Sequence, residues 1–392
     1  MVDDQFLNQM GIAEESGKQG LLMTLFLISY SISNLLGAPI SDFIGPRKTM
    51  ILGLVLASAA MFIGGVAGTF ITILLVRVML GVAQGIYFPT QSSMVQRWFP
   101  PGERGLANGI CGFGGCIGPI IAVPFFAFLI SQWDWQSVFL EPAVAGLIAV
   151  LFPLTGLITD ESENNRWVSQ QEKDFIRTAN KDANQQQVPD FHLQGIKKIL
   201  ASGTFWMMCI TYTAYLCIWW GLVTWSPQYL VMARGYSVYS IGWVAAIPYI
   251  FAGVGILLGG YISDKSSNRA KLGAISLVGA ALCILIAIFI PSNSAAVAFI
   301  AVALAFNEFY YAPVWAMLQK LLPSELIGTG SGLMNGICNM ISASSPLIIG
   351  LLIQQTHSYD AGLFFLVIIG MIGAIACTSL YIRTGRRIAQ TH

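Results

Sequence analysis

Eleven apolar runs of about 20 residues each, separated by polar loops, dominate this chain of 392 residues. About 20 consecutive apolar residues are what an α-helix needs to cross the hydrocarbon core of a bilayer. Only 10% of the residues are charged, against roughly a quarter in soluble proteins. The sequence therefore predicts an all-α protein of the lipid bilayer, with spans near Gly20–Ile40, Met50–Gly68, Phe70–Gln91, Leu106–Ile130, Ser137–Ile158, Thr204–Leu230, Ile241–Ile262, Leu272–Ile290, Ala295–Met317, Thr329–Ile353 and Gly362–Ile382.

The longest polar stretch, residues 159–203, separates five predicted spans from six. It contains EKDFIRTANKDANQQQVPD, which is charged, rich in glutamine and poor in residues that could be buried. Such a composition is typical of a solvated linker, here with one surface helix. We therefore expect an N-terminal helical bundle over residues 1–158, a linker over 159–203 and a C-terminal bundle over 204–392.

Basic residues are distributed unevenly between the two sides of the membrane. Seventeen of the twenty lie in the linker, in the tail or in loops on the same side as both. The positive-inside rule places that side in the cytoplasm of a cell-membrane protein. An odd number of spans then leaves the N-terminus outside, and the first 20 residues lack the basic and apolar regions of a signal peptide.

The sequence contains no motif that would indicate several other classes of function. It has no phosphate-binding loop, no paired-histidine zinc helix and no cluster of His or Cys, so neither an enzyme, a metal site nor another cofactor is indicated. The seven cysteines lie in or beside spans and indicate packing. A net charge of +1 gives no argument for nucleic acid. We expect a monomer.

Arg77 lies about a third of the way into an apolar span, where a charge must face a polar interior or a wet cavity. At helical spacing, Gly81, Gln84 and Gln91 share its side. Gly81 and Gly85 form a small-xxx-small pair that allows a neighbouring helix to approach. Two hypotheses remain open: Arg77 ties helices together, or it lines the path of an anion.

Glu308 is the second charge placed deep in an apolar span. An ionised carboxylate there is costly, so protonation is favoured, as a proton-coupling site requires. Asn307 and Tyr311 share its surroundings at helical spacing. The alternative is a neutral, hydrogen-bonded structural carboxyl group.

The Thr204–Leu230 span is unusually aromatic, and Tyr212, Tyr215 and Trp219 follow one another at helical spacing on one face. Such a stripe is common in interfacial belts and in packed cores.

Two stretches of the chain repeat each other. GLANGIC at residues 105–111 recurs as GLMNGIC at 332–338, each followed at the same distance by a proline, Pro119 or Pro346. SDFIGPRK around Asp42 matches SDKSSNRAK around Asp264. Like segments in like positions indicate a duplicated bundle with its site where the two halves meet. One span is missing before Asp42 relative to Asp264, so we expect a first helix to be absent from this chain.

The repeated helices are rich in small residues, which allow close packing with asparagine hydrogen bonds across it. We therefore expect helix-packing roles, ahead of substrate contact, for Asn108, Asn335 and Asn339. Pro119 and Pro346 should bend these helices and free backbone carbonyls for gating motions.

The aspartate-containing loops, the Arg-xxx-Gly-xx-Gln run and the six-plus-six layout resemble the major facilitator superfamily. Within it, LGVAQGIYFPTQSSMVQRWFPPGERGLANGI, QYLVMARGYSVYSIGWVAAIPYIFAGVGILLGGYISD and the YYAP…GTGSGLMNGICN…SSP run are most similar to the anion:cation symporter family, which carries sugar acids and other organic anions. The resemblance implies a two-bundle helical transporter, in which Asp42, Arg104 and Asp264 gate the cytoplasmic side. It also implies that the Thr204–Leu230 span lines the cavity, where tyrosine hydroxyls would bind a hydroxylated substrate. Gln84 stands where the family often has Glu, which puts ordinary proton coupling in doubt.

These features together predict a secondary active transporter of a small organic anion. Arg77 would bind the substrate carboxylate, with Gln84, Gln91, Tyr212, Tyr215, Asn307 and Tyr311 holding its hydroxyls. Glu308 would carry the coupled ion, H⁺ or Na⁺. The alternatives are an exporter of neutral or lipophilic compounds, and a truncated product that does not transport.

Overall fold

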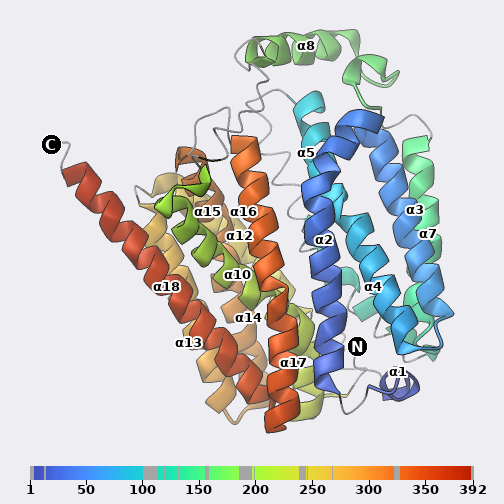
Figure 1. Cartoon of the computed structure of the whole chain (residues 1–392), viewed down its shortest axis with the longest axis vertical. Coiled ribbons are helices and arrows are strands. Elements are labelled where there is room, and N and C mark those ends of the chain that lie inside the picture. Colours follow the sequence, from blue (N-terminus) through green and yellow to red (C-terminus); the bar gives the residue numbers. More distant parts are fainter. Residues whose placement is uncertain are drawn as a thin grey trace. The chain divides into compact units, whose positions relative to one another are not determined.

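The computed structural model of the chain describes residues 4–12, 15–99, 132–154, 159–184, 199–237, 246–266, 268–321 and 327–389, with scattered single residues and short pieces between. The regular elements in these ranges are all helices (Figure 1). They belong to two compact units. The C-terminal unit comprises Met1–Thr24, Cys116–Ser131 and His192–His392, and the N-terminal unit comprises Leu25–Gly115 and Gln132–Phe191.

The N-terminal unit is built from α2 (Ser16–Ile44) from Leu25 onward, α3 (Pro46–Gly65), α4 (Phe70–Gly85), α5 (Tyr87–Trp98) and α7 (Ser137–Leu154). Helix α3 packs against both α4 and α7. Its first turn is capped from the linker, because the Asp160 carboxylate accepts a hydrogen bond from the Arg47 N–H at 2.7 Å. An acidic group at a helix N-terminus is favourable for the helix dipole.

The linker carries a short 3₁₀ turn, η1 (Ser162–Asn164), followed by α8 (Gln170–Asn184). The expected surface helix is therefore present, and its side chains are mostly exposed. The end of α5 is tied to the start of the linker. Arg97 Nη1 lies 2.8 Å from Glu161 Oε1, and Trp98 Nε1 donates to the Thr159 carbonyl at 2.9 Å.

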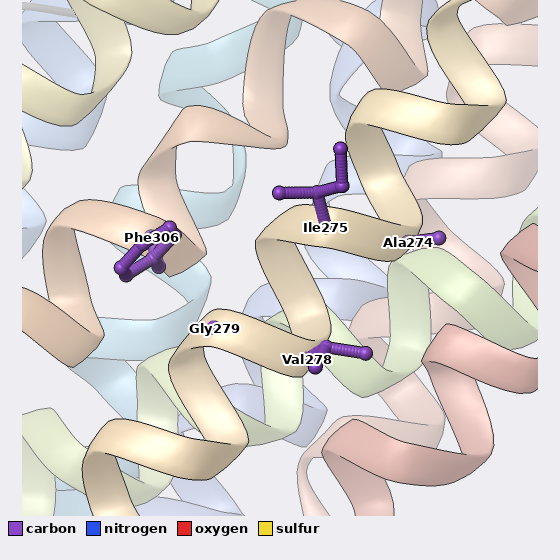
Figure 2. A pocket seen from close by; sticks show the side chains of 5 residues that line it. All are labelled: Ala274, Ile275, Val278, Gly279 and Phe306. Carbon is purple, nitrogen blue, oxygen red and sulfur yellow. The ribbon is translucent and has the colours of Figure 1, made fainter.

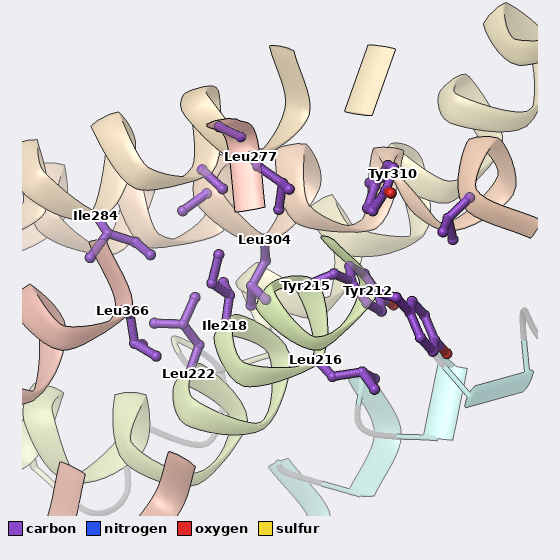
Figure 3. Packing of buried hydrophobic residues seen from close by; sticks show 14 of the residues in the cluster. Tyr212, Tyr215, Leu216, Ile218, Leu222, Leu277, Ile284, Leu304, Tyr310 and Leu366 are labelled. Atoms are coloured by element: carbon purple, nitrogen blue, oxygen red, sulfur yellow. The ribbon is translucent and has the colours of Figure 1, made fainter. Parts of the chain in front are cut away.

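The C-terminal unit surrounds the long helix α10 (Gly203–Gln228), which continues as a π-helical turn, η2 (Tyr229–Ala233). Ile218, Leu222 and Leu304 belong to its buried core, with Leu277 and Leu366 (Figure 3). The remaining helices are α1 (Asp4–Gln9), α12 (Ile247–Lys265), α13 (Arg269–Phe289), α14 (Asn293–Phe309), α15 (Tyr311–Leu321), α16 (Ile327–Ser342), α17 (Ser344–Thr356) and α18 (Tyr359–Ala389).

The first turns of α2 belong to the C-terminal unit, and polar bonds hold them there. Thr24 Oγ1 donates to the Ala343 carbonyl at 2.7 Å, and Gln228 Nε2 donates to Gln19 Oε1 at 2.9 Å. Gly20 lies directly against the Pro346 backbone, so that a Cβ at this position would clash. Helix α2 therefore takes part in both units.

Three apolar runs expected as single spans are broken in the same way. The helix is interrupted at Ile86 between α4 and α5, at Tyr310 between α14 and α15, and at Ala343 between α16 and α17. A proline follows each break by three residues: Pro89, Pro313 and Pro346. Because proline has no N–H and its ring clashes with the carbonyl four residues back, the hydrogen-bond ladder cannot continue through it.

The expected spans correspond to helices of the structure. Six stretches of the described residues are long and apolar enough to cross a membrane, and four shorter apolar helices accompany them. Together with α2 they correspond to the predicted apolar runs, except that much of the run Leu106–Ile130 lies outside the described residues. The predicted boundary is close at α10, which begins at Gly203 instead of Thr204, whereas α18 extends to Ala389, beyond the predicted end at Ile382.

Candidate functional site

Arg77 lies in the middle of α4, beside a close helix pair of the N-terminal unit. One turn further on, Gly81 lies against Phe26 and Ser29 of α2. A Cβ on Gly85 would come within 2.7 Å of Ser33 Cβ and 3.1 Å of Asn34 N. Small residues therefore let α2 and α4 run almost backbone to backbone along this seam.

The Arg77 guanidinium lacks the compensation that a buried cation normally has. Its Nε is buried and has no hydrogen-bond partner, and the ion pairs among the described residues do not include it. On α2, Asn34 Nδ2 is likewise buried without a partner. Both unpaired groups are donors, which suits an anion with acceptor oxygens.

The two glutamines expected beside Arg77 differ in position. Gln84 lies on α4 and its side chain is exposed, whereas Gln91 lies beyond the break at Ile86, on α5, and is half-buried. The predicted continuous polar seam is therefore interrupted at Ile86, because Pro89 ends the helix ladder.

The C-terminal unit gathers seven predicted residues and Trp315 into one cluster. Tyr215 donates its hydroxyl hydrogen bond to Glu308 Oε1 at 2.7 Å, and Tyr212 donates to Asn335 Oδ1 at 3.2 Å. The polar-aromatic cluster, as we call it, consists of Tyr212 and Tyr215 on α10, Asn307 and Glu308 on α14, Tyr311 and Trp315 on α15, and Asn335 and Asn339 on α16.

Aromatic rings form the frame of this cluster. Tyr212 and Tyr215 stack with ring centroids 5.5 Å apart, and Trp315 meets Tyr212 edge to face at 5.2 Å. Tyr311 lies 6.3 Å from Tyr215. Figure 3 shows the two α10 tyrosines side by side, next to the apolar core. Their hydroxyls are engaged by protein groups, so a substrate hydroxyl would have to compete for them.

The two asparagines of α16 link that helix to α10. Asn339 Nδ2 donates to Asn335 Oδ1 at 2.9 Å, and Trp220 Nε1 donates to Asn339 Oδ1 at 3.3 Å. Because Tyr212 also donates to Asn335 Oδ1, the side-chain amides of both asparagines have hydrogen-bond partners. The packing role that we expected for Asn335 and Asn339 stays a prediction.

Two polar atoms of the cluster have no partner: Asn307 Oδ1 and Trp315 Nε1 are both buried and unpaired. Glu308 is 3% exposed, and the described residues provide it with no basic neighbour. An unpaired acceptor, an unpaired donor and an uncompensated carboxyl group therefore lie within one buried region.

Two glycines that the sequence analysis did not single out set the position of α14. A Cβ on Gly255 would clash with the Ala305 backbone, and one on Gly259 would come within 2.9 Å of Phe309 Cα. The Gly-xxx-Gly spacing of residues 255–259 was visible in the sequence. It indicates close helix packing but does not say which helix is the partner.

The predicted gating residues are only partly described. Arg104, Asn108 and Pro119 lie outside the described residues, and Asp42 on α2 and Asp264 on α12 are described in backbone only. Pro346 lies in α17, three residues after the break at Ala343, and its carbonyl accepts from Trp225 Nε1 at 3.0 Å. Their gating roles stay predictions.

A shallow apolar depression lies on α13 and α14 (Figure 2). Its walls are Ala274, Ile275, Val278, Gly279 and Phe306. No polar side chain lines it, so it offers no hydrogen-bond donor to the carboxylate of an organic acid. Among the described residues, no three or more His, Cys, Asp and Glu side chains gather into a group that could hold a metal ion.

The chain is similar to known transporters over almost its whole length. It is 27% identical to a hexuronate transporter of Bacillus subtilis over 89% of this chain and 82% of that protein. It is 28% identical to a probable sulfoacetate transporter of Cupriavidus necator over 95% of this chain and 87% of that protein. Both relatives are transporters, not enzymes.

The fold has a solved counterpart. The crystal structure of a bacterial homolog to the human lysosomal transporter Spinster, inward-facing and unoccupied, has a TM-score of 0.76 at 18% identity, covering 97% of this chain and 92% of that one. The sequence model of the Major Facilitator Superfamily matches residues 6–346, and a second match covers residues 239–390. The chain is a multi-pass membrane protein and belongs to the Major Facilitator Superfamily.

Proposed function

We propose that this chain is a secondary active transporter of small organic anions that carry a carboxylate, sugar acids among them, working by alternating access in the cell membrane. The names of its relatives support this substrate class, since hexuronate and sulfoacetate are both small acids with a carboxylate. The positive-inside distribution supports a cytoplasmic linker and C-terminus.

The observation that carries the proposal is Arg77. A guanidinium inside an apolar helix needs compensation, yet its Nε is buried and unpaired and no carboxylate of the described residues pairs with it. A substrate carboxylate supplies what is missing. Two parallel hydrogen bonds from the planar guanidinium to the carboxylate oxygens would both stabilise the bound substrate and orient it.

The other predicted residues have subordinate roles in this proposal. Gln84, Gln91, Tyr311 and the two α10 tyrosines serve the hydroxyls of a sugar acid, and Glu308 couples transport to a cation. Asp42, Arg104 and Asp264, with the bends at Pro119 and Pro346, control the cytoplasmic gate.

The test is Arg77→Lys, with binding and melting measured on the same purified protein. Lysine keeps the charge but loses the two-point fork. One charge-assisted hydrogen bond is worth about 1.5–3 kcal/mol, so affinity for a hexuronate should fall roughly tenfold to a hundredfold. The melting temperature should be unchanged, because Arg77 Nε is unpaired and the ion pairs of the described residues do not include Arg77.

Arg234→Lys is the matched control. Arg234 Nη1 donates to the Ile290 carbonyl at 2.9 Å and Nη2 to the Ala287 carbonyl at 2.7 Å, which holds the end of α13. This variant should melt earlier and bind with unchanged affinity. If Arg77→Lys instead melts earlier and binds normally, Arg77 ties helices together and is not in the site.

A further inference from the structure

Asn307 presents an oxygen that the protein does not use. The residue is fully buried (0% exposed), and its Nδ2 donates to the Tyr215 carbonyl at 3.4 Å. Its Oδ1 has no hydrogen-bond partner. A buried polar atom without a partner costs about 1–3 kcal/mol, so this oxygen is expected to meet a ligand in the working protein.

The neighbouring residue adds a carboxylate. Glu308 is buried next to Asn307, and Tyr215 donates to its Oε1 at 2.7 Å. The ion pairs of the described residues do not involve Glu308. The hydroxyl of Tyr215 fixes the orientation of the carboxyl group, but it cannot neutralise a negative charge.

The backbone adds an oxygen that the helix does not use. Asn307 and Glu308 lie in the last turn of α14, which ends at Phe309, before the break at Tyr310. Pro313 has no N–H, so the Phe309 carbonyl receives no helical hydrogen bond from it. Helix α15 begins directly after the break, at Tyr311, so α14 has no free end here. A buried side-chain oxygen, a buried carboxyl group and a carbonyl released from the helical ladder therefore belong to three consecutive residues, without an ion-pair partner among the described residues.

We propose that Asn307 and Glu308, at the break between α14 and α15, bind a sodium ion. Oxygen ligands of this kind are those that hard cations prefer. With a single carboxylate, a monovalent cation leaves the site neutral, whereas a divalent ion would leave a buried positive charge. A proton on Glu308 would also neutralise the carboxylate, and the resulting O–H group could donate to Asn307 Oδ1, so the pH dependence of melting is measured beside the Na⁺ dependence. That this ion drives transport rests on the proposed function, but binding itself does not.

The experiment measures thermal unfolding of the purified protein in detergent, without organic acid, while NaCl replaces choline chloride at constant ionic strength. A ligand that binds only the folded state raises the melting temperature with concentration. We expect a saturable upward shift with Na⁺ and a smaller one with K⁺. Glu308→Gln should abolish the Na⁺ shift, and Asn307→Leu should raise the half-saturating concentration about tenfold or more.

Asn339→Leu is the matched control, because it makes the same change at an equally buried position whose amide groups both have partners. It should melt earlier than the unchanged protein and keep the same Na⁺ response. Should Asn307→Leu fail to fold, Asn307→Asp preserves the shape, and its second carboxylate should tighten cation binding.

Three results would overturn the proposal. The first is equal melting in Na⁺, K⁺ and choline. The second is a Na⁺ shift that persists in Glu308→Gln. The third is a melting temperature that depends on pH through Glu308 but not on Na⁺, which would identify a proton site. Since no organic acid is present, a failure here leaves hexuronate binding at Arg77 to be judged by its own test.

Discussion

The glycine pair Gly259 and Gly260 provides a sharp test of the packing that positions Glu308. Both residues lie on α12, one position apart. A Cβ on Gly259 would come within 2.9 Å of both Phe309 Cα and its carbonyl carbon, whereas a Cβ on Gly260 would meet only Ala312 Cβ at 3.9 Å. The first contact is with backbone that cannot turn aside, and the second is ordinary van der Waals contact.

The two alanine substitutions should therefore act in opposite directions. Overpacking a tight interface costs about 1–3 kcal/mol, so Gly259→Ala should destabilise the protein by that amount. Replacing a helical glycine with alanine where space allows gains roughly 0.5–1 kcal/mol. Gly260→Ala should then be as stable as the unchanged protein or slightly more stable, and the two variants should differ by about 1.5–4 kcal/mol.

The assay is unfolding of both variants in the same detergent, followed by tryptophan fluorescence. Gly259→Ala should unfold at a clearly lower temperature, and because it displaces the end of α14, its Na⁺-induced shift should shrink as well. Equal melting of the two variants, or the reverse order, would show that α12 and α14 do not approach each other as closely as the structure has them.

Two further predictions concern coupling and orientation. Glu308→Gln should abolish ion-driven accumulation of organic acid in vesicles but leave exchange of labelled for unlabelled substrate intact, because exchange needs no net ion movement; accumulation that survives would make Glu308 structural. The test uses a protein in which all seven cysteines are replaced and a single cysteine is then introduced. A cysteine at the exposed Ser169 of the linker should react with a membrane-impermeant reagent only after the membrane is opened. A cysteine at the exposed Asn293 should react in intact cells. The reverse pattern would overturn the orientation.

The sequence predicted the helices well because lipid leaves the backbone few alternatives to the α-helix. The apolar runs therefore mark the membrane-spanning segments, although three of the runs are each divided into two helices. Arg77 and Glu308 could be found because a charged side chain inside an apolar span is energetically unfavourable and usually has a functional role. Tyr212 and Tyr215 were singled out because the span is unusually aromatic and the two tyrosines share one face at helical spacing, and the family resemblance gave them a cavity role.

The arrangement of these residues was less accessible to sequence analysis. Tyr215 and Glu308 are 93 residues apart, and no local pattern says that α10 and α14 bring them together. The breaks at Ile86 and Tyr310 were missed although Pro89 and Pro313 were visible, because a proline in a membrane span can kink a helix without ending it. The sequence likewise does not show which helix contacts Gly255 and Gly259.

The most direct test of the central claim is uptake by the purified protein in proteoliposomes. A labelled hexuronate should enter vesicles preloaded with the same unlabelled acid, sulfoacetate should compete with it, and an uncharged hexose should not. Arg77→Lys should reduce this counterflow sharply, whereas Arg234→Lys should sustain it once corrected for the amount of folded protein. Counterflow that the uncharged hexose inhibits as well as the acids do, or that Arg77→Lys leaves at full rate, would contradict the assignment of an organic-anion transporter.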